Sequence, residues 1–228
     1  MKLPISARLS ACAAMVPAGS VVADVGCDHG YLGISLLTEN RARKVFACDL
    51  REGPLAQARR NAERFGVDDR MEFFLCDGLT GLAPGCADTV VIAGMGGDTI
   101  RHILEQSPWV MEAEIVRIVQ PQSSVPEFRE YLATSRLTIA EETLVREGRF
   151  LYTVMRLETG EEETISPWEQ YCSRVLMQSG SDLLPEYLDR QIEGLRKAVA
   201  GMEKSGPSER LSRERNAMKE LMEMRKQL

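Results

Sequence analysis

The sequence predicts an α/β protein whose mainly parallel sheet ends in an antiparallel hairpin and is followed by a helical tail. Three patterns support this fold class. Between positions 21 and 157, short apolar, β-branched runs alternate with longer helical segments, as in parallel strands covered on both faces. Two further runs are separated by a four-residue turn, and a seam of apolar residues at coiled-coil spacing follows them.

Five apolar runs define the first part of the sheet. They lie at 21–25, 44–48, 72–75, 89–93 and 115–119, with helical patterns in the segments between them. Because these runs are apolar along almost their whole length, we expect parallel strands that are buried on both faces.

The end of the sheet follows a different pattern. After a helical segment at 125–134, the runs 138–145 and 150–157 flank Arg146-Glu147-Gly148-Arg149, which indicates a hairpin. Five parallel strands and a hairpin give seven strands, one more than the dinucleotide-binding sheet contains. The strand count therefore favours the Rossmann-like, seven-stranded class I methyltransferase fold.

The chain is expected to divide into a catalytic α/β domain at 1–160 and a helical tail at 161–228. Residues 166–169 form a capping-box pattern that predicts a helix to about Gln178. Two further helices, separated by a break at 204–208, are expected to fold back as an antiparallel coiled-coil hairpin. Their predicted seam comprises Leu188, Ile192, Leu195, Val199 and Met202 in the first helix and Leu211, Met218, Leu221 and Leu228 in the second.

Composition excludes several classes of protein. The net charge of −6 argues against a protein that coats nucleic acid by bulk electrostatics, although residues 196–228 contain nine basic and five acidic residues. No apolar run approaches the length of a membrane span, and no signal peptide is evident, so a cytoplasmic location without membrane association is expected. The six cysteines contain no C-x-x-C pair and are expected to be reduced core residues, with no metal site.

The segment 22–33 carries the strongest signal for a ligand. A strand ends in Asp24-Val25-Gly26, and glycines at 26 and 30 allow the backbone to approach a ligand. In a dinucleotide site a glycine would occupy the position of Asp28, whose carboxylate would repel a pyrophosphate. S-adenosylmethionine has no phosphate and carries an ammonium and a sulfonium, so Asp24 and Asp28 suit it better. The alternative is a capping aspartate in a tight turn.

The ends of three later strands complete the predicted donor site. Asp49 stands 23 positions after Gly26, close to the offset at which a carboxylate accepts ribose hydroxyls. Asp77 follows the third strand and is expected to accept from the adenine amino group, or else to be a solvated turn residue. The glycine-rich loop at 94–97 is expected to contact donor or substrate, or else to be a flexible turn. The predicted donor-binding set is Asp24, Gly26, Asp28, His29, Asp49, Leu50, Asp77, Gly78, Gly94 and Met95.

The two histidines are His29 and His102. His102 falls within a predicted helix and is expected to be structural. His29 lies in the donor loop, where packing and catalysis remain alternatives.

Several motifs together resemble a known family. Ser6-Ala7-Arg8-Leu9, the run Ala23-Asp24-Val25-Gly26-Cys27-Asp28-His29-Gly30-Tyr31-Leu32, Ala93-Gly94-Met95-Gly96-Gly97 and Gln120-Pro121-Gln122 are similar to those of bacterial tRNA (adenine-22-N1)-methyltransferases, the TrmK family. The similarity extends to about Leu157, and the tail matches that family's coiled-coil hairpin in kind. Cys27 and Gly30 depart from the serine and alanine expected there.

The resemblance implies transfer of a methyl group from S-adenosylmethionine to N1 of adenine 22 in the D-arm of tRNA, with S-adenosylhomocysteine as product. N1 offers an in-plane lone pair at neutral pH, so no prior deprotonation is needed, and catalysis depends on alignment and electrostatics. The base must be turned out into the pocket. Asp28, Tyr31 and Gln120 are the expected catalytic residues. Asp28 is expected to be an acceptor near the developing charge, and Tyr31 is expected to stack on the base. Gln120 is expected to hydrogen-bond the edge of the base, and Gln122 is a second candidate for this role. Tyr31 is alternatively a core residue of the first helix.

Two other functions remain open at this stage. A methyltransferase of small molecules would share the donor site but would have no use for a basic helical hairpin. A non-catalytic ligand-binding module would retain the sheet and lose the ligand geometry. Whether the tail contacts tRNA or presents a solvated surface is likewise open, and no obligate protein partner is evident.

Overall fold

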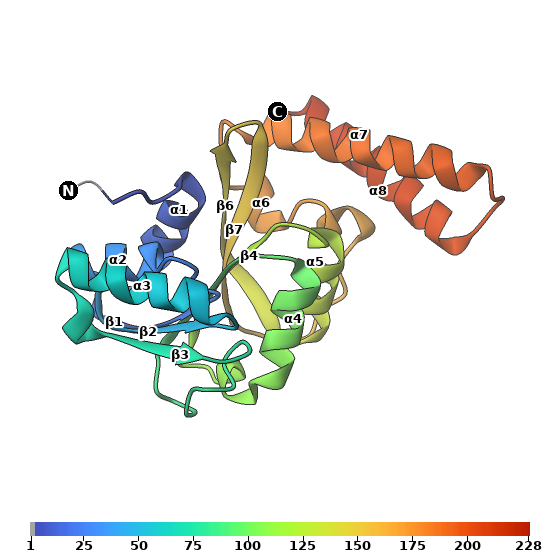
Figure 1. Ribbon diagram of the computed structural model, residues 1–228. Coiled ribbons are helices and arrows are strands. Elements are labelled where there is room, and N and C mark those ends of the chain that lie inside the picture. The colour runs from blue at the N-terminus through green and yellow to red at the C-terminus, as the bar shows by residue number, and fades with distance from the viewer. Residues whose placement is uncertain (1–2) are drawn as a thin grey trace.

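The computed structural model describes residues 3–228 and contains one seven-stranded sheet with the strand order β3-β2-β1-β4-β5-β7-β6 (Figure 1). β1 to β5 are mutually parallel, and β7 runs antiparallel to both β5 and β6. The strands are β1 Ser20–Val25, β2 Ala42–Asp49, β3 Met71–Leu75, β4 Thr89–Met95, β5 Val116–Pro121, β6 Leu137–Glu147 and β7 Phe150–Thr159. The predicted fold class, with five parallel strands and a terminal hairpin, is confirmed.

Helices cover both faces of the sheet. The longer ones are α1 Ala7–Met15, α2 Tyr31–Thr38, α3 Glu52–Phe65, α4 Gly97–Gln106, α5 Val125–Thr134, α7 Leu184–Glu203 and α8 Glu209–Lys226. Residues on α1, α2 and α3 share a core with Val22 and Val91, whereas residues on α4 and α5 share a core with Ala23 and Val90. Neighbouring strand residues therefore face opposite layers, as the pleat requires.

The segment at 166–178 differs from the predicted helix. Its capping box is present, but it begins only a 3₁₀ turn, η3 Pro167–Gln170, and a separate single-turn helix, α6 Arg174–Met177, follows. Ser173 is extended, with ψ of 160°, and its side chain accepts from the Leu176 amide. This second N-cap interrupts the helix, because an N-cap residue has non-helical dihedral angles.

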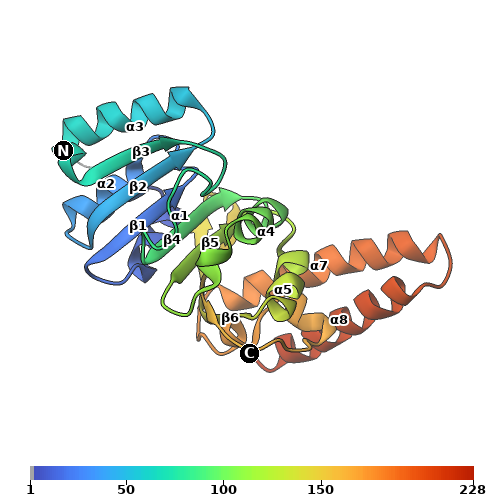
Figure 2. The same ribbon diagram turned by 90° about the horizontal axis from the view of Figure 1, so that it is seen from below.

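The tail folds into the predicted antiparallel hairpin, and Figure 2 shows α7 and α8 extending side by side away from the sheet. Leu188, Ile192, Leu195 and Val199 are buried on α7, and Leu211, Ala217 and Leu221 are buried on α8. Leu228 was expected in the seam, but this prediction is wrong. Leu228 lies beyond the end of α8 and is 58% exposed.

The base of the tail shares a core with the α/β domain. Leu144 of β6 packs in one cluster with Cys172, Leu184 and Tyr187. We propose residue 160 as the domain boundary because β7 ends at Thr159, but the two parts are not independent in packing.

All six cysteines are free thiols; Cys76 and Cys86 are only half-buried, and the other four are buried. None of the helices within residues 3–228 is both long enough and apolar enough to cross a membrane. Across the same residues, no cluster of His, Cys, Asp and Glu side chains has a composition and spacing that suit a metal ion.

Candidate active site

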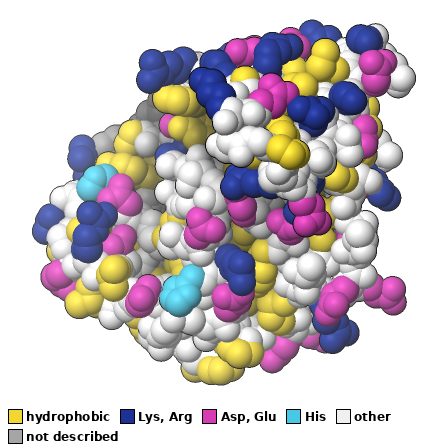
Figure 3. Space-filling view, turned by 90° about the vertical axis from the view of Figure 1, so that its right-hand side faces the viewer, with side chains coloured by type: hydrophobic (Ala, Val, Ile, Leu, Met, Phe, Trp, Pro, Cys, Tyr) yellow, Lys and Arg dark blue, Asp and Glu magenta, His cyan; other side chains and the backbone are white. Residues whose placement is uncertain are grey.

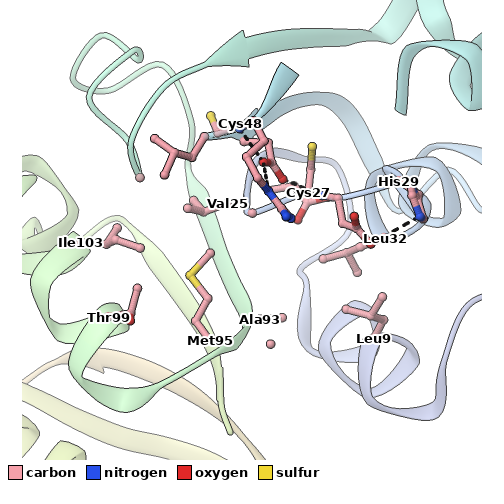
Figure 4. Close-up of a pocket in the computed structure, with 18 of the residues that line it drawn as sticks. Leu9, Val25, Cys27, His29, Leu32, Cys48, Ala93, Met95, Thr99 and Ile103 are labelled. Atoms are coloured by element: carbon pink, nitrogen blue, oxygen red, sulfur yellow. Dashed lines mark hydrogen bonds and ion pairs between the residues drawn. The ribbon is translucent and has the colours of Figure 1, made fainter. Parts of the chain in front are cut away.

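A cavity of about 470 Å³ opens at the carboxyl ends of β1 to β4. β1 and β4 are neighbours although two strands separate them in sequence, so the cavity lies at the topological switch point where α/β sheets bind ligands. All ten residues of the predicted donor-binding set line it, as does Tyr31. Figure 4 shows Met95 projecting from the end of β4 between Ala93 and the side chains of α4.

The loop after β1 has a backbone that only certain residues tolerate. Gly26 has φ of +70°, and a Cβ there would lie 2.3 Å from Met95 Cε. The amides of Gly26 and Cys27 both donate to the Cys48 carbonyl, at 2.8 and 2.9 Å. Asp28 also adopts a left-handed conformation, with φ of +48°, which is uncommon outside glycine but better tolerated by aspartate than by most residues. The loop is thus bent sharply beside the cavity.

Asp49 joins this loop to the loop after β2. Its Oδ2 accepts from the Asp28 amide at 3.1 Å, and its Oδ1 accepts from the Arg51 amide at 2.9 Å. The residue is only 6% exposed, yet each carboxylate oxygen has lone-pair capacity left. Asp49 is therefore fixed in position and able to accept from two hydroxyl groups in the cavity.

Asp24 carries a buried polar atom without a partner. The residue is 4% exposed, and its Oδ2 makes no hydrogen bond within the described chain. Burial raises the pKa of Asp24 to about 7; the Gly33 amide opposes this shift, and the charge of Asp49 adds to it. An ionised, unpartnered carboxylate in such a place is costly. The site therefore suits a ligand that brings a cation or hydrogen-bond donor, and S-adenosylmethionine has both.

Asp28, His29 and Tyr31 lie at the mouth of the cavity. The side chains of Asp28 and His29 are 61% and 47% exposed, and the Asp28 Oδ2 to His29 Nε2 distance is 3.8 Å. The Tyr31 ring is half-buried and meets the His29 ring edge-on at 6.0 Å. His102 is exposed on α4 and does not line the cavity. Asp28 and Tyr31 are thus accessible to a base that enters from outside.

The structure does not place Gln120 in the cavity. The side chain is fully buried; its Oε1 accepts from Arg8 Nη1 at 2.9 Å and from the Gly94 amide at 3.1 Å, and its Nε2 donates to the Pro121 carbonyl at 2.9 Å. With both ends of the amide occupied, the expectation that Gln120 reads a base edge is not supported. It instead positions Arg8 and Gly94, and Gln122 lines the cavity.

The glycines in the loop after β4 have two different structural roles. Gly94, with φ of +81°, faces the cavity. A Cβ at Gly97 would instead lie 2.7 Å from the Ser124 carbonyl oxygen, so this glycine permits α4 to start close to the loop after β5. Of the three glycines in this loop, only Gly94 lines the cavity, where a contact with donor or substrate was expected.

Sequence reasoning missed several lining residues. Arg8 and Leu9 come from α1, Thr99 and Ile103 come from α4, and Cys27 and Cys48 come from the β1 loop and β2. No local pattern marks the helical residues as site residues, because the fold brings them to the cavity from segments far apart in sequence. The available signals were the Ser6-Ala7-Arg8-Leu9 motif for the residues of α1 and the motif at 23–32 for Cys27.

The tail's basic side chains are less free than expected. Figure 3 shows Lys and Arg side chains over the upper part of the molecule, with Asp and Glu among them. Of the nine basic residues at 196–228, seven pair with acidic side chains along the hairpin and on α5, which favours the alternative of a solvated surface for much of the tail. Those seven are Arg196, Lys197, Arg210, Arg213, Arg215, Arg225 and Lys226.

Comparisons with known proteins agree with this geometry. A family model described as a methyltransferase domain matches residues 5–155. A Bacillus subtilis protein named tRNA (adenine(22)-N(1))-methyltransferase is 33% identical over 162 residues, which is 71% of this chain and 68% of the relative. A putative tRNA methyltransferase of Mycoplasma pneumoniae is 32% identical, covering 74% and 75% of the two chains.

Solved structures extend the likeness to the tail. The crystal structure of the Bacillus subtilis m1A22 tRNA methyltransferase TrmK has a TM-score of 0.84 at 25% identity and covers 99% of both chains. A putative m1A22 tRNA methyltransferase from Streptococcus pneumoniae, in complex with S-adenosyl-L-methionine, has a TM-score of 0.82 at 27% identity and covers 95% of this chain and 99% of that one. The chain belongs to the tRNA (adenine(22)-N(1))-methyltransferase family.

Proposed function

We propose that this protein transfers a methyl group from S-adenosylmethionine to N1 of adenine 22 in tRNA. The observation that carries the proposal is the cavity at the β1/β4 switch point, where the Oδ2 of buried Asp24 makes no hydrogen bond and Asp49 retains acceptor capacity. Two carboxylates there disfavour a phosphate and favour the cationic methyl donor. Family membership supports the choice of the acceptor base.

The chain's own residues align and stabilise the reactants in this proposal. When bound, S-adenosylmethionine supplies an electrophilic methyl group on its sulfonium. Asp49 holds the ribose hydroxyls, and Asp24 interacts with a cationic group of the donor. Asp28 offers negative charge at the mouth, where adenine becomes positive as N1 forms its new bond, and Tyr31 stacks on the base. No side chain needs to remove a proton from N1, so alignment and electrostatics supply the rate enhancement.

Transcribed tRNA and isotope-labelled donor test the function directly. We expect 1-methyladenosine in nuclease digests analysed by mass spectrometry, and none from a tRNA in which adenine 22 is replaced by guanine. Methylation of both transcripts, or of neither, would contradict the proposal. All the residues that we propose to bind the donor line a cavity within this chain, and we propose that no protein partner is required. A tRNA substrate implies action in the cytoplasm.

Removal of the charge of Asp28 tests its chemical role. Asp28→Asn suits this test better than alanine, because asparagine also tolerates the left-handed backbone found there. We expect kcat to fall on the order of tenfold, since the side chain is partly solvated and is not an enclosed electrostatic group. The Kd for tRNA should change less than twofold. Wild-type turnover at saturating donor would exclude a chemical role for Asp28.

The raised pKa of Asp24 predicts proton release on donor binding. In the free protein the pKa of this carboxyl is about 7, against an ordinary value of 3.8. Its protonated form therefore contributes to folding stability below the unfolded pKa, and this contribution to stability is lost as pH rises through 7. A cationic donor favours the ionised form, so donor affinity should increase from pH 6 to pH 7.5. Calorimetry at pH 6.5 in buffers of different ionisation enthalpy should show protons released by wild type and fewer by Asp24→Asn. Equal release by both would refute the role of Asp24.

A further inference from the structure

Arginine and aromatic side chains form a continuous strip from the tip of the β6–β7 hairpin to the donor cavity. The guanidinium of Arg149 lies over the Phe150 ring at 4.9 Å, and the Phe150 and Tyr152 rings are 6.0 Å apart. The guanidinium of Arg8 lies over the Tyr152 ring at 5.6 Å. We call Arg149, Phe150, Tyr152 and Arg8 the hairpin strip.

The inner end of the hairpin strip is part of the active site. Arg8 lines the cavity and donates to Gln120, whose Oε1 also accepts from the amide of Gly94. Phe150 and Tyr152 are alternate residues of β7, so their side chains project from the same face of the strand. A molecule that reaches the cavity along this face would contact both rings.

The outer end of the hairpin strip is exposed. Phe150 is 49% exposed, and Arg149 is exposed at the turn. Arg149 forms no ion pair with any residue from 3 to 228, unlike most basic residues of the tail. A single exposed phenylalanine is ordinary on a protein surface. Its position here, between an unpaired guanidinium and a second ring that leads to the cavity, indicates a ligand with both anionic and planar groups.

The hairpin turn lies where the catalytic domain meets the tail. Figure 1 shows the β6–β7 turn between α1 and the start of α7. α1 packs against both strands of the hairpin, and Arg146 next to the turn pairs with Glu186 of α7. A long polyanion seated on the tail and entering the cavity would therefore pass over the hairpin strip.

We propose that the hairpin strip binds the tRNA nucleotides that neighbour the methylated adenine. This inference rests on the proposed function. An adenine that enters the cavity must leave its stack, and its neighbours then expose ring faces that aromatic side chains bind with little sequence preference. Phe150 and Tyr152 stack on these bases, and Arg149 binds a phosphate. The chain is acidic overall, with a net charge of −6, so local contacts of this kind are needed to hold an RNA.

Fluorescence anisotropy with labelled tRNA tests the hairpin strip independently of catalysis. Phe150→Ala should weaken tRNA binding about tenfold, within the range that loss of one stacked base produces, whereas Phe150→Trp should keep it within about twofold. Arg149→Gln should weaken binding several-fold and reduce the slope of log K against log salt by about one. The donor Kd and the Tm should not change, because both side chains are exposed.

Arg59 provides a matched control. It is also an exposed arginine over a phenylalanine, at 4.7 Å from the Phe73 ring, but it lies beside β3 at the opposite edge of the sheet. Arg59→Gln removes the same charge and should leave tRNA affinity within about twofold of wild type. An equal loss from Arg59→Gln and Arg149→Gln would show an effect of overall charge and would overturn the proposal.

The outcomes separate this proposal from the proposed function. If wild type methylates tRNA and Phe150→Ala binds tRNA with unchanged affinity, the hairpin strip is refuted and the function stands. If wild type binds tRNA without methylating it and Phe150→Ala weakens that binding, the function is refuted, and the hairpin strip is retained as a tRNA-binding surface without a methylated adenine beside it. A wild-type protein that binds no tRNA refutes both, and binding of a protein in its place would assign the strip to a protein partner.

Discussion

Replacement of Asp49 by alanine is expected to weaken S-adenosylmethionine binding at least a hundredfold. The two ribose hydroxyls would lose a charged acceptor, at about 1.5–3 kcal/mol for each hydrogen bond, and 2.7 kcal/mol already corresponds to about a hundredfold in Kd. The variant also releases the amides of Asp28 and Arg51, which Asp49 now holds. Isothermal calorimetry measures the change, and donor affinity within twofold of wild type would exclude Asp49 from the donor site.

Asp88→Ala separates donor binding from loop stability. Asp88 also accepts from a backbone amide, that of Val21, at 3.0 Å, but it precedes β4 at the opposite end of the sheet from the cavity. This variant should lose a similar amount of stability and keep normal donor affinity. If both variants lost donor affinity together, the effect of Asp49→Ala would be a general loosening of the sheet.

The cavity residues that we propose to bind the donor were predictable from sequence because the pattern that marks them is local. Each stands at or just after the end of a strand, and parallel strands bring those ends to one edge of the sheet. The glycines of the turns were also predictable. Gly26 and Gly94 have positive φ in the structure, and glycine is the residue expected where a strand bends sharply at a ligand. Asp28 was identified because it occupies a position at which a phosphate-binding loop would have glycine.

The acceptor half was less predictable because it depends on contacts between distant segments. Gln120 stands at the end of β5, where the same strand-end rule placed it in the site. In the structure its side chain is instead occupied by Arg8, 112 residues earlier in the chain, together with the Gly94 amide and the Pro121 carbonyl. The strip from Arg149 to Arg8 likewise requires the crossing of α1 over the hairpin, and no sequence period encodes that crossing.

The tail shows the same division between local and distant information. Its heptad spacing gave the hairpin, and the seam residues from Leu188 to Val199 are buried as expected. The ion pairs of the tail could not be predicted from the sequence, because they depend on the face of the helix from which each arginine projects. Arg213, for example, pairs with Glu130 of α5. Ser173 began a second short helix where a capping-box pattern predicted one continuous helix.

Loss of the buried arginine that joins α5 to the base of the tail is expected to have the largest effect on stability. Arg129 pairs with Glu142 of β6, and their side chains are 2% and 0% exposed. Glu142 also accepts from the Thr153 and Ser173 hydroxyls, and Arg129 donates to the Gln170 carbonyl at 3.0 Å. Burial by itself would lower the pKa of Arg129, but Glu142 and Tyr187 raise it above its ordinary value. The guanidinium is therefore charged.

Arg129→Met leaves Glu142 without its countercharge in the core. Breaking such a pair from one side costs about 3–5 kcal/mol, which for a chain of this size lowers Tm by roughly 10 °C. The exposed pair Arg146–Glu186, with side chains 43% and 41% exposed, provides the control. Arg146→Met should cost no more than about 1 kcal/mol.

The same cluster predicts the result of removing the tail. Cleavage after Gly160 leaves all seven strands intact, since β7 ends at Thr159, but it removes Gln170, Ser173 and Tyr187 from around the buried pair. We therefore expect the truncated chain to be destabilised to a similar extent as Arg129→Met.

The double variant Arg129→Met/Glu142→Leu, which removes both charges, should recover part of the stability that Arg129→Met loses, because replacing a whole buried pair by apolar residues is often neutral. Thermal melts of the single, double and control variants decide the matter. An Arg129→Met variant as stable as wild type would mean that this buried pair does not stabilise the fold.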